Sequence, residues 1–180
     1  MSFIKREERK YLPEFVYGGI DGVVTTFAVV AGAVGASLNP AIVLILGFAN
    51  LFADGFSMAV SNYLSTKSQL DLHKGHPDFY KYRLIGKHPL KSGMATFISF
   101  FIIGLIPLLS FVFALVFPAL KNNQFLLASI LTAAALLLVG AVKGQIVNKH
   151  PLKAALETLV IGGIAAGLAF LVGYWLQGLA

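Results

Sequence analysis

The sequence contains no cysteine among its 180 residues. This absence excludes disulfides, thiolate metal sites and cysteine nucleophiles. Charged residues are also scarce, at 12% of the chain, whereas soluble domains carry roughly 25%. Hydrophobic residues make up 57% of the chain and the mean hydropathy is +0.80, so the composition is that of a membrane protein. No HExxH, GxSxG or glycine-rich phosphate-loop motif occurs, which removes three common enzyme signatures.

Long apolar stretches divide the chain into five segments that can each cross a membrane, since a crossing needs about 20 mostly apolar residues. The polar start has no small-residue cleavage site after a short apolar core, so we expect the first apolar segment to remain as a helix. The sequence therefore predicts an all-α membrane protein with a single domain, residues 1–180. The expected spans are residues 14–37, 40–65, 92–118, 123–146 and 153–178.

Positive charge is distributed unevenly between the connections. Thirteen of the 14 Lys and Arg residues lie in the N-terminal tail, the 67–91 linker and the 143–153 connection, and the other is Lys121. With five spans, these three regions share one side of the membrane. The positive-inside rule then predicts a cytoplasmic N-terminus and an external C-terminus. Tyr174 and Trp175 would lie near the outer interface, where aromatic residues gather.

Several small residues and prolines indicate how the helices pack and bend. The pairs Gly18/Gly22 and Gly163/Gly167 have the small-xxx-small spacing that allows close helix contact in lipid, although glycine is also common in membrane helices. Pro107, inside the third span, predicts a kink or a break.

Ionisable residues inside the spans are few. A charge at mid-bilayer costs about 2.5–3.5 kcal/mol on insertion scales, so it normally faces a cavity or a partner. Lys143 and Glu157 lie near the cytoplasmic ends of adjacent spans, where they can pair or where Lys143 can reach the interface. Asp21 and Asp54 have no such basic partner nearby, and Glu14 lies at the edge of the first span.

The second span carries four polar or soft side chains at intervals of four residues: Asn50, Asp54, Met58 and Asn62. Each step of four turns the helix by only about 40° beyond a full turn, so the four form a stripe. Carboxylate and amide oxygens suit Mn²⁺ and Fe²⁺, and a thioether adds preference for softer ions over Mg²⁺ or Ca²⁺. The alternatives are that Met58 fills the core and that each Asn forms an interhelical hydrogen bond.

Depth places Asp21 beside this stripe. At 1.5 Å per residue, Asp21 lies about 10 Å from the cytoplasmic boundary, level with the interval between Asp54 and Met58. Two carboxylates at one depth repel unless a cation or a proton lies between them. We therefore predict a metal site formed by the five residues Asp21, Asn50, Asp54, Met58 and Asn62.

In the linker, four further side chains have ligating groups but are more often solvated: Asp71, His73, His76 and Asp78.

The segments YGGIDGVVTTFAVVAGAVGA, GFANLFADGFSMAVSNYLSTKSQ, GAVKGQ and ALETLVIGGIAAGLAFLVG resemble the vacuolar iron transporter family, and the resemblance covers all five spans. It implies a dimeric five-helix fold that exports cytoplasmic Fe²⁺ or Mn²⁺ in exchange for protons. The family's path runs between the protomers along the first two helices. Its helix-one aspartate corresponds to Asp21 and its helix-two methionine to Met58.

Two departures from the family pattern stand out. Plant-type members carry a helix-two glutamate where this chain has Asn50, so we expect Asp54, one turn further on, to supply the carboxylate. Those members also have a long glutamate-rich cytoplasmic domain between helices two and three, whereas the 67–91 linker contains no glutamate. A short bacterial-type member, in the plasma (inner) membrane, fits this pattern.

The leading prediction is thus a proton-coupled exporter of Fe²⁺ or Mn²⁺, a homodimer without a resident cofactor, an enzymatic activity or a nucleic-acid partner. One alternative is an intramembrane lipid phosphoalcohol transferase, but that family's arginine and its later aspartate pair are absent here. The other is a non-transporting membrane scaffold, which the acidic stripe disfavours.

Overall fold

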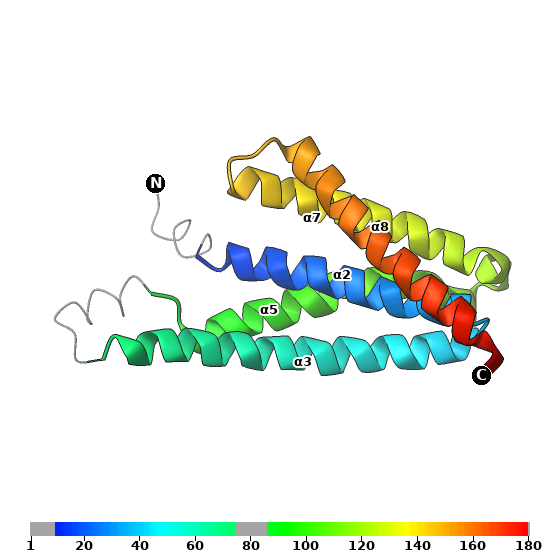
Figure 1. Cartoon of the computed structure of the whole chain (residues 1–180), viewed down its shortest axis with the longest axis horizontal. Helices are drawn as coiled ribbons and strands as arrows, with labels where there is room; N and C mark the ends of the chain where they lie inside the picture. The colour runs from blue at the N-terminus through cyan, green and yellow to red at the C-terminus, as the bar shows by residue number, and fades with distance from the viewer. Residues whose placement is uncertain (1–9, 75–85, 180) are drawn as a thin grey trace.

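A computed structural model shows an all-helical chain, and it describes residues 10–74 and 86–179 (Figure 1). This confirms the predicted all-α fold class. Six α-helices and two short 3₁₀ helices are present in the described part. They are α2 (Leu12–Gly35), α3 (Pro40–Leu72), α5 (Pro89–Gly104), α6 (Ile106–Val116), η1 (Pro118–Asn123), α7 (Gln124–Ile146), α8 (Pro151–Leu176) and η2 (Gln177–Leu179).

Four of the described helical segments are long and apolar enough to cross a membrane, and α5 with α6 makes a fifth if that bent pair is one span. The pair bends by 47°, as Pro107 predicts, because a proline at the second position of α6 cannot donate a backbone hydrogen bond to the preceding turn. The expected kink is therefore present, with Leu105 between the two helices.

The second helix extends past its expected end at residue 65 and continues to Leu72. Hydropathy falls beyond Leu64, but the sequence TKSQLDL contains no proline or glycine that would end a helix. The first part of the expected linker is thus helical, because hydrogen bonding along the backbone does not depend on side-chain hydropathy.

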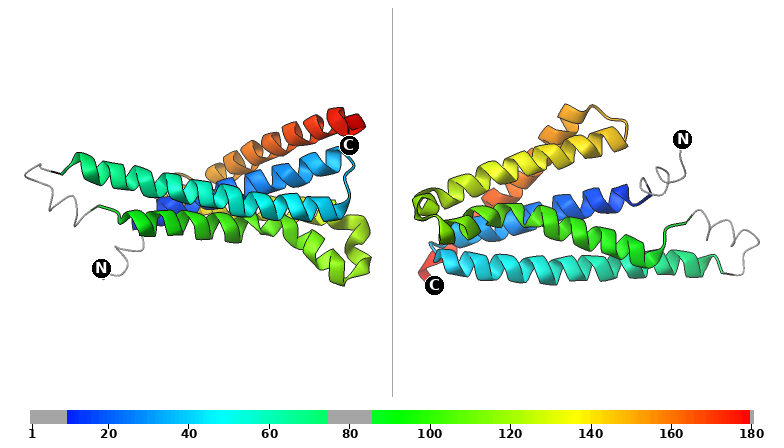
Figure 2. Two further views of the ribbon diagram at one scale, coloured as in Figure 1. Left: turned by 90° about the horizontal axis from the view of Figure 1, so that it is seen from below. Right: turned by 180° about the vertical axis from the view of Figure 1, so that it is seen from behind.

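Helix α2 lies at the centre of the bundle (Figures 1 and 2). It contacts α3 and α5 on one side and α7 and α8 on the other. The start of α2, the end of α3, the start of α5 and the α7–α8 connection all lie at one end of the molecule, which we call the basic end. All described Lys residues except Lys121 belong to elements at this end. The orientation of that end towards the cytoplasm remains a prediction.

The two glycine pairs have different surroundings. A Cβ atom added at Gly18 would lie 2.6 Å from the Thr96 carbonyl oxygen, and one added at Gly22 would lie 2.9 Å from Phe100 Cα. This pair therefore packs α2 against α5. A Cβ atom added at Gly163 or Gly167 would meet nothing within 4 Å. Close packing is therefore confirmed for the α2 pair, whereas the α8 pair faces outward.

Candidate functional site

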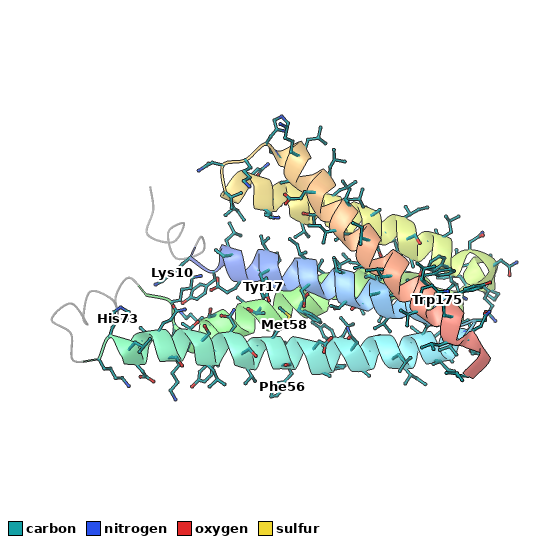
Figure 3. All side chains as sticks on the ribbon, in the orientation of Figure 1. Lys10, Tyr17, Phe56, Met58, His73 and Trp175 are labelled. Atoms are coloured by element: carbon teal, nitrogen blue, oxygen red, sulfur yellow. The ribbon has the colours of Figure 1, made fainter. Side chains whose placement is uncertain are left out.

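Met58 and Asn62 of the predicted stripe lie on the side of α3 that faces α2. Figure 3 shows Met58 pointing from α3 towards α2, while Phe56 points to the opposite side of α3. Asp54 is exposed, whereas Met58 and Asn62 are half-buried. Met58 also packs against the hydrophobic core that contains Leu51 and Phe100. The thioether therefore fills space in the core and, at the same time, borders the surface between the two helices.

Asp21 on α2 is half-buried, and Asp54 lies close enough to act on it electrostatically. The two carboxylates come from neighbouring helices and have the same sign. A cation shared between them would remove this repulsion. Asp54 is thus within electrostatic range of Asp21, as their matched depth predicts, while Asp21 itself lines a separate pocket with Lys143 of α7.

A groove of about 520 Å³ runs between α2 and α3 and is here called the inner groove. Its α3 wall contains Met58 and Asn62 of the predicted stripe, and it adds three serines that the sequence reasoning missed. These serines repeat every four residues beside the stripe, which is the signal that would have identified them. They are Ser57, Ser61 and Ser65.

The two asparagines differ in their partners. The Asn62 side-chain amide donates to Thr96 Oγ1 of α5 at 2.6 Å, and the Ser92 hydroxyl approaches Asn62 Oδ1 at 3.3 Å. Asn62 thus makes the interhelical hydrogen bond that was its alternative role. The buried Nδ2 of Asn50 has no hydrogen-bond partner among the described residues. A buried donor without a partner is costly, so Asn50 is the asparagine that still requires one.

Glu14 is the functional candidate that the sequence reasoning placed only at the edge of a span. It is 7% exposed, and its Oε1 accepts hydrogen bonds from Lys87 Nζ at 2.5 Å and from Ser92 Oγ at 2.9 Å. Its Oε2 is buried and has no hydrogen-bond partner in the described part of the chain. Glu14 precedes Asp21 by seven residues, which is almost two full helical turns. That spacing was a signal that both carboxylates share one face of α2.

Other predicted charge contacts lie apart from this groove. Lys143 Nζ is 3.9 Å from Glu157 Oε2, which confirms the expected pairing of α7 with α8. In the linker region, Asp71 forms an ion pair with Lys74, and His73 Nδ1 lies 2.7 Å from the Gln69 carbonyl oxygen. His76 and Asp78 lie outside the described residues, so the expectation that these linker side chains are mostly solvated is untested at those two positions.

Within the described ranges, no three His, Asp or Glu side chains gather closely enough to hold a metal ion. One chain therefore offers the carboxylates of Asp21 and Asp54, a thioether and amide oxygens, spread along α2 and α3 rather than gathered at a point. Such a row is suited to a path along which an ion passes from ligand to ligand. It differs from a closed structural metal site, in which four ligands surround the ion.

Comparison with known proteins identifies the family. The sequence model of the VIT family matches residues 12–84 and 74–174, which together reach into every span. The chain belongs to the VIT family. The two matched blocks overlap at residues 74–84, within the linker between α3 and α5, where this VIT protein was expected to lack a domain found in plant-type members.

Relatives of this VIT protein occur in several different organisms. The vacuolar iron transporter of Plasmodium berghei (strain Anka) is 28% identical, with 94% of this chain and 84% of the relative aligned. That of Toxoplasma gondii (strain ATCC 50861 / VEG) is 28% identical over 93% and 74% of the two chains. Vacuolar iron transporter 1 of Eucalyptus grandis is 27% identical over 87% and 83%. These relatives bear transporter names, in agreement with the expectation that this VIT protein is not an enzyme.

Proposed function

We propose that this VIT protein is a homodimeric membrane transporter that exports Fe²⁺ or Mn²⁺ from the cytoplasm in exchange for protons. Its relatives are named iron transporters, and the row of ligating side chains on α3 carries the proposal for this chain. The enzyme alternative has no support in those names, and a scaffold gives no reason for carboxylates in two neighbouring spans.

The decisive observation is the exposed carboxylate of Asp54 in the middle of a helix that is apolar enough to cross a membrane. A charge at this depth costs about 2.5–3.5 kcal/mol unless a cavity, a partner or a cation receives it. No basic side chain pairs with Asp54 among the described residues. A hydrated or partly dehydrated cation beside Asp54 and Asp21 would offset that cost.

The exposure of Asp54 also supports a dimer. Lipid against this side of α3 would leave the carboxylate unsolvated, whereas a second copy related by a two-fold axis would enclose it. Two copies would place two Asp21 and two Asp54 side chains around one axis. Such a site has the charge that a divalent cation needs when it loses part of its hydration shell.

Proton exchange follows from the chemistry of these ligands. A carboxylate binds a metal only when it is deprotonated, so protons and metal compete for Asp21 and Asp54. Loading from the cytoplasm and release on the opposite, more acidic side would then couple the two ions. Met58 adds a softer ligand, which favours Fe²⁺ or Mn²⁺ over Mg²⁺ and Ca²⁺. The plasma membrane remains our proposed location.

The test is metal flux into liposomes that contain the purified protein, with Fe²⁺ and Mn²⁺ assayed separately and with an imposed pH gradient. Asp21→Asn and Asp54→Asn retain the shape and an oxygen atom but remove the charge, so either change should lower flux by at least about tenfold, which corresponds to 1.4 kcal/mol. Met58→Ala should reduce the preference for Mn²⁺ over Mg²⁺ more than it lowers the maximal rate.

The matched control is Glu157→Gln, which removes a carboxylate from an exposed position on α8, where its ion-pair partner is Lys143 at 3.9 Å. It should leave flux within about twofold of the wild-type protein, since such exposed pairs contribute little. Wild-type flux from both aspartate variants would refute a metal path along α2 and α3. Flux that ignores the pH gradient would refute proton exchange while leaving metal transport intact.

A further inference from the structure

A second groove, here called the outer groove, opens from the basic end and has a volume of about 590 Å³. The outer and inner grooves share three lining residues, Glu14, Asn62 and Ser65. Met58 lines only the inner groove, and Lys87 lines only the outer groove. A cation that moves from the basic end towards Met58 therefore passes the Glu14 carboxylate.

The two oxygens of Glu14 are not equivalent. Oε1 accepts from the Lys87 ammonium and from the Ser92 hydroxyl, whereas Oε2 is buried and lacks a partner among the described residues. Buried polar atoms almost always have a hydrogen-bond partner, and a buried charged oxygen without one is costly. Glu14 lines both grooves, so a cation bound to this carboxylate would supply the partner that Oε2 lacks.

Lys87 is placed so that it can leave this carboxylate. It belongs to the non-helical residues 86–88 that precede α5, so its movement does not require any helix to unwind. Its side chain is 34% exposed, whereas the Glu14 side chain is 8% exposed. The flexible lysine stem can return the ammonium to water, where it is strongly hydrated. The Glu14 carboxylate lies on helix α2 and stays largely buried.

We propose that Lys87 is a tethered competing cation, which holds Glu14 until a divalent metal entering from the basic end displaces it. This inference rests on the proposed direction of transport. It adds an entrance site at Glu14, about two helical turns before Asp21, and assigns Lys87 as the residue that sets the metal concentration needed to load it. The Ser92 hydroxyl of α5 donates to this carboxylate and also approaches Asn62 Oδ1 of α3.

Competition follows from charge. An ammonium and a divalent ion on one carboxylate repel each other, so the metal binds only to molecules in which Lys87 has left. The apparent affinity for metal is then the intrinsic affinity multiplied by the fraction of molecules in which the ion pair is open. Removal of the ammonium should raise metal affinity, although it also removes a contact that holds α5 to α2.

The experiment measures Mn²⁺ binding to the full-length protein in lipid nanodiscs, with free Mn²⁺ detected by electron paramagnetic resonance. Lys87→Met keeps the length of the side chain and removes its charge, and it should tighten Mn²⁺ binding by roughly three- to tenfold. The control is Lys91→Met, which removes the same charge from an exposed position one turn into α5 and should change the affinity by less than about twofold.

The effect must also depend on Glu14. In a Glu14→Gln background, Lys87→Met should produce no further tightening, because the ion pair that it relieves is already absent. If Lys87→Met fails to fold, Lys87→Arg tests the same idea in the other direction. Arg can form two hydrogen bonds with the carboxylate, so this variant should bind Mn²⁺ more weakly than the wild-type protein.

A purely structural ion pair predicts lower stability for Lys87→Met with no gain in Mn²⁺ affinity, and that result would overturn the proposal. Equal gains in Lys87→Met and Lys91→Met, or a gain that persists without Glu14, would overturn it as well. Liposome flux separates this outcome from a failure of the proposed function. A wild-type protein that transports metal while Lys87→Met binds it normally refutes only the role of Lys87.

Discussion

The close contact between α2 and α5 can be tested by adding a single methyl group at Gly22. A Cβ atom at this position would lie 2.9 Å from Phe100 Cα and 3.0 Å from the Phe100 carbonyl carbon. The contact is reciprocal, because a Cβ atom at Gly104 would lie 2.8 Å from the Gly22 carbonyl oxygen. These obstacles are backbone atoms, so a side-chain rotation cannot relieve them.

The expected magnitude follows from these distances. Carbon atoms in contact prefer separations of about 3.5–4.0 Å, so α5 would have to move by roughly 0.5–1 Å. Overpacking of this kind costs about 1–3 kcal/mol, and the better helix propensity of alanine returns at most about 1 kcal/mol. Gly22→Ala should therefore lower the free energy of unfolding by about 1–2 kcal/mol.

The assay is reversible unfolding in mixed detergent micelles with increasing sodium dodecyl sulfate, followed by circular dichroism. Gly163→Ala and Gly167→Ala are the matched controls, since nothing lies within 4 Å of an added Cβ atom at either position. Both should be as stable as the wild-type protein or up to about 1 kcal/mol more stable. Gly22→Ala should also reduce metal flux, because it separates α5 from α2, the helix that carries Asp21.

Wild-type stability of Gly22→Ala would show that α2 and α5 do not approach each other as closely as described. Loss of stability in Gly163→Ala as large as that in Gly22→Ala would show that the outer face of α8 is covered by a second copy. That result would move the proposed dimer contact from α3 to α8.

Two further predictions concern the hydrogen bonds of α3 and the orientation of the chain. Asn62→Ala should lower the free energy of unfolding by about 1–2 kcal/mol, because it removes one hydrogen-bond partner from Thr96 and one from Ser92. It should retain most of the metal flux, and a flux loss as large as that of Asp54→Asn would return Asn62 to the ligand set. Single cysteines introduced at Lys74 and Lys149 should both be labelled only from the cytoplasm. The chain has no native cysteine, so any label reports the introduced position. Labelling from opposite sides would overturn the five-span topology.

The sequence alone was sufficient to predict the class of protein and the positions of its helices. Apolar runs of 20 or more residues have to form helices in lipid, because backbone groups there have no water to bond with. Pro107 marked the break between α5 and α6 for a similarly local reason. The end of α3 was predicted too early because hydropathy reports the membrane boundary rather than the helix end.

The stripe on α3 was also visible in the sequence, since a period of four residues places side chains on one side of a helix. Which neighbour each side chain meets is a different question. Asn50 and Asn62 occupy equivalent positions in that pattern, but only Asn62 lies opposite the hydroxyl groups of α5. Helix periodicity gives the direction of a side chain relative to its own axis, and the packing of other helices decides its partner.

Only the tertiary structure determines the ion-pair partner of Glu14 and which of the two glycine pairs packs against another helix. Glu14 and Lys87 are separated by 73 positions in the chain, and no local pattern links them, so their ion pair exists only because α2 packs against the start of α5. Gly18/Gly22 and Gly163/Gly167 have identical spacing, yet one pair is buried against a backbone and the other is open. Spacing can permit close contact between helices, but only the positions of the neighbouring helices determine whether that contact is made.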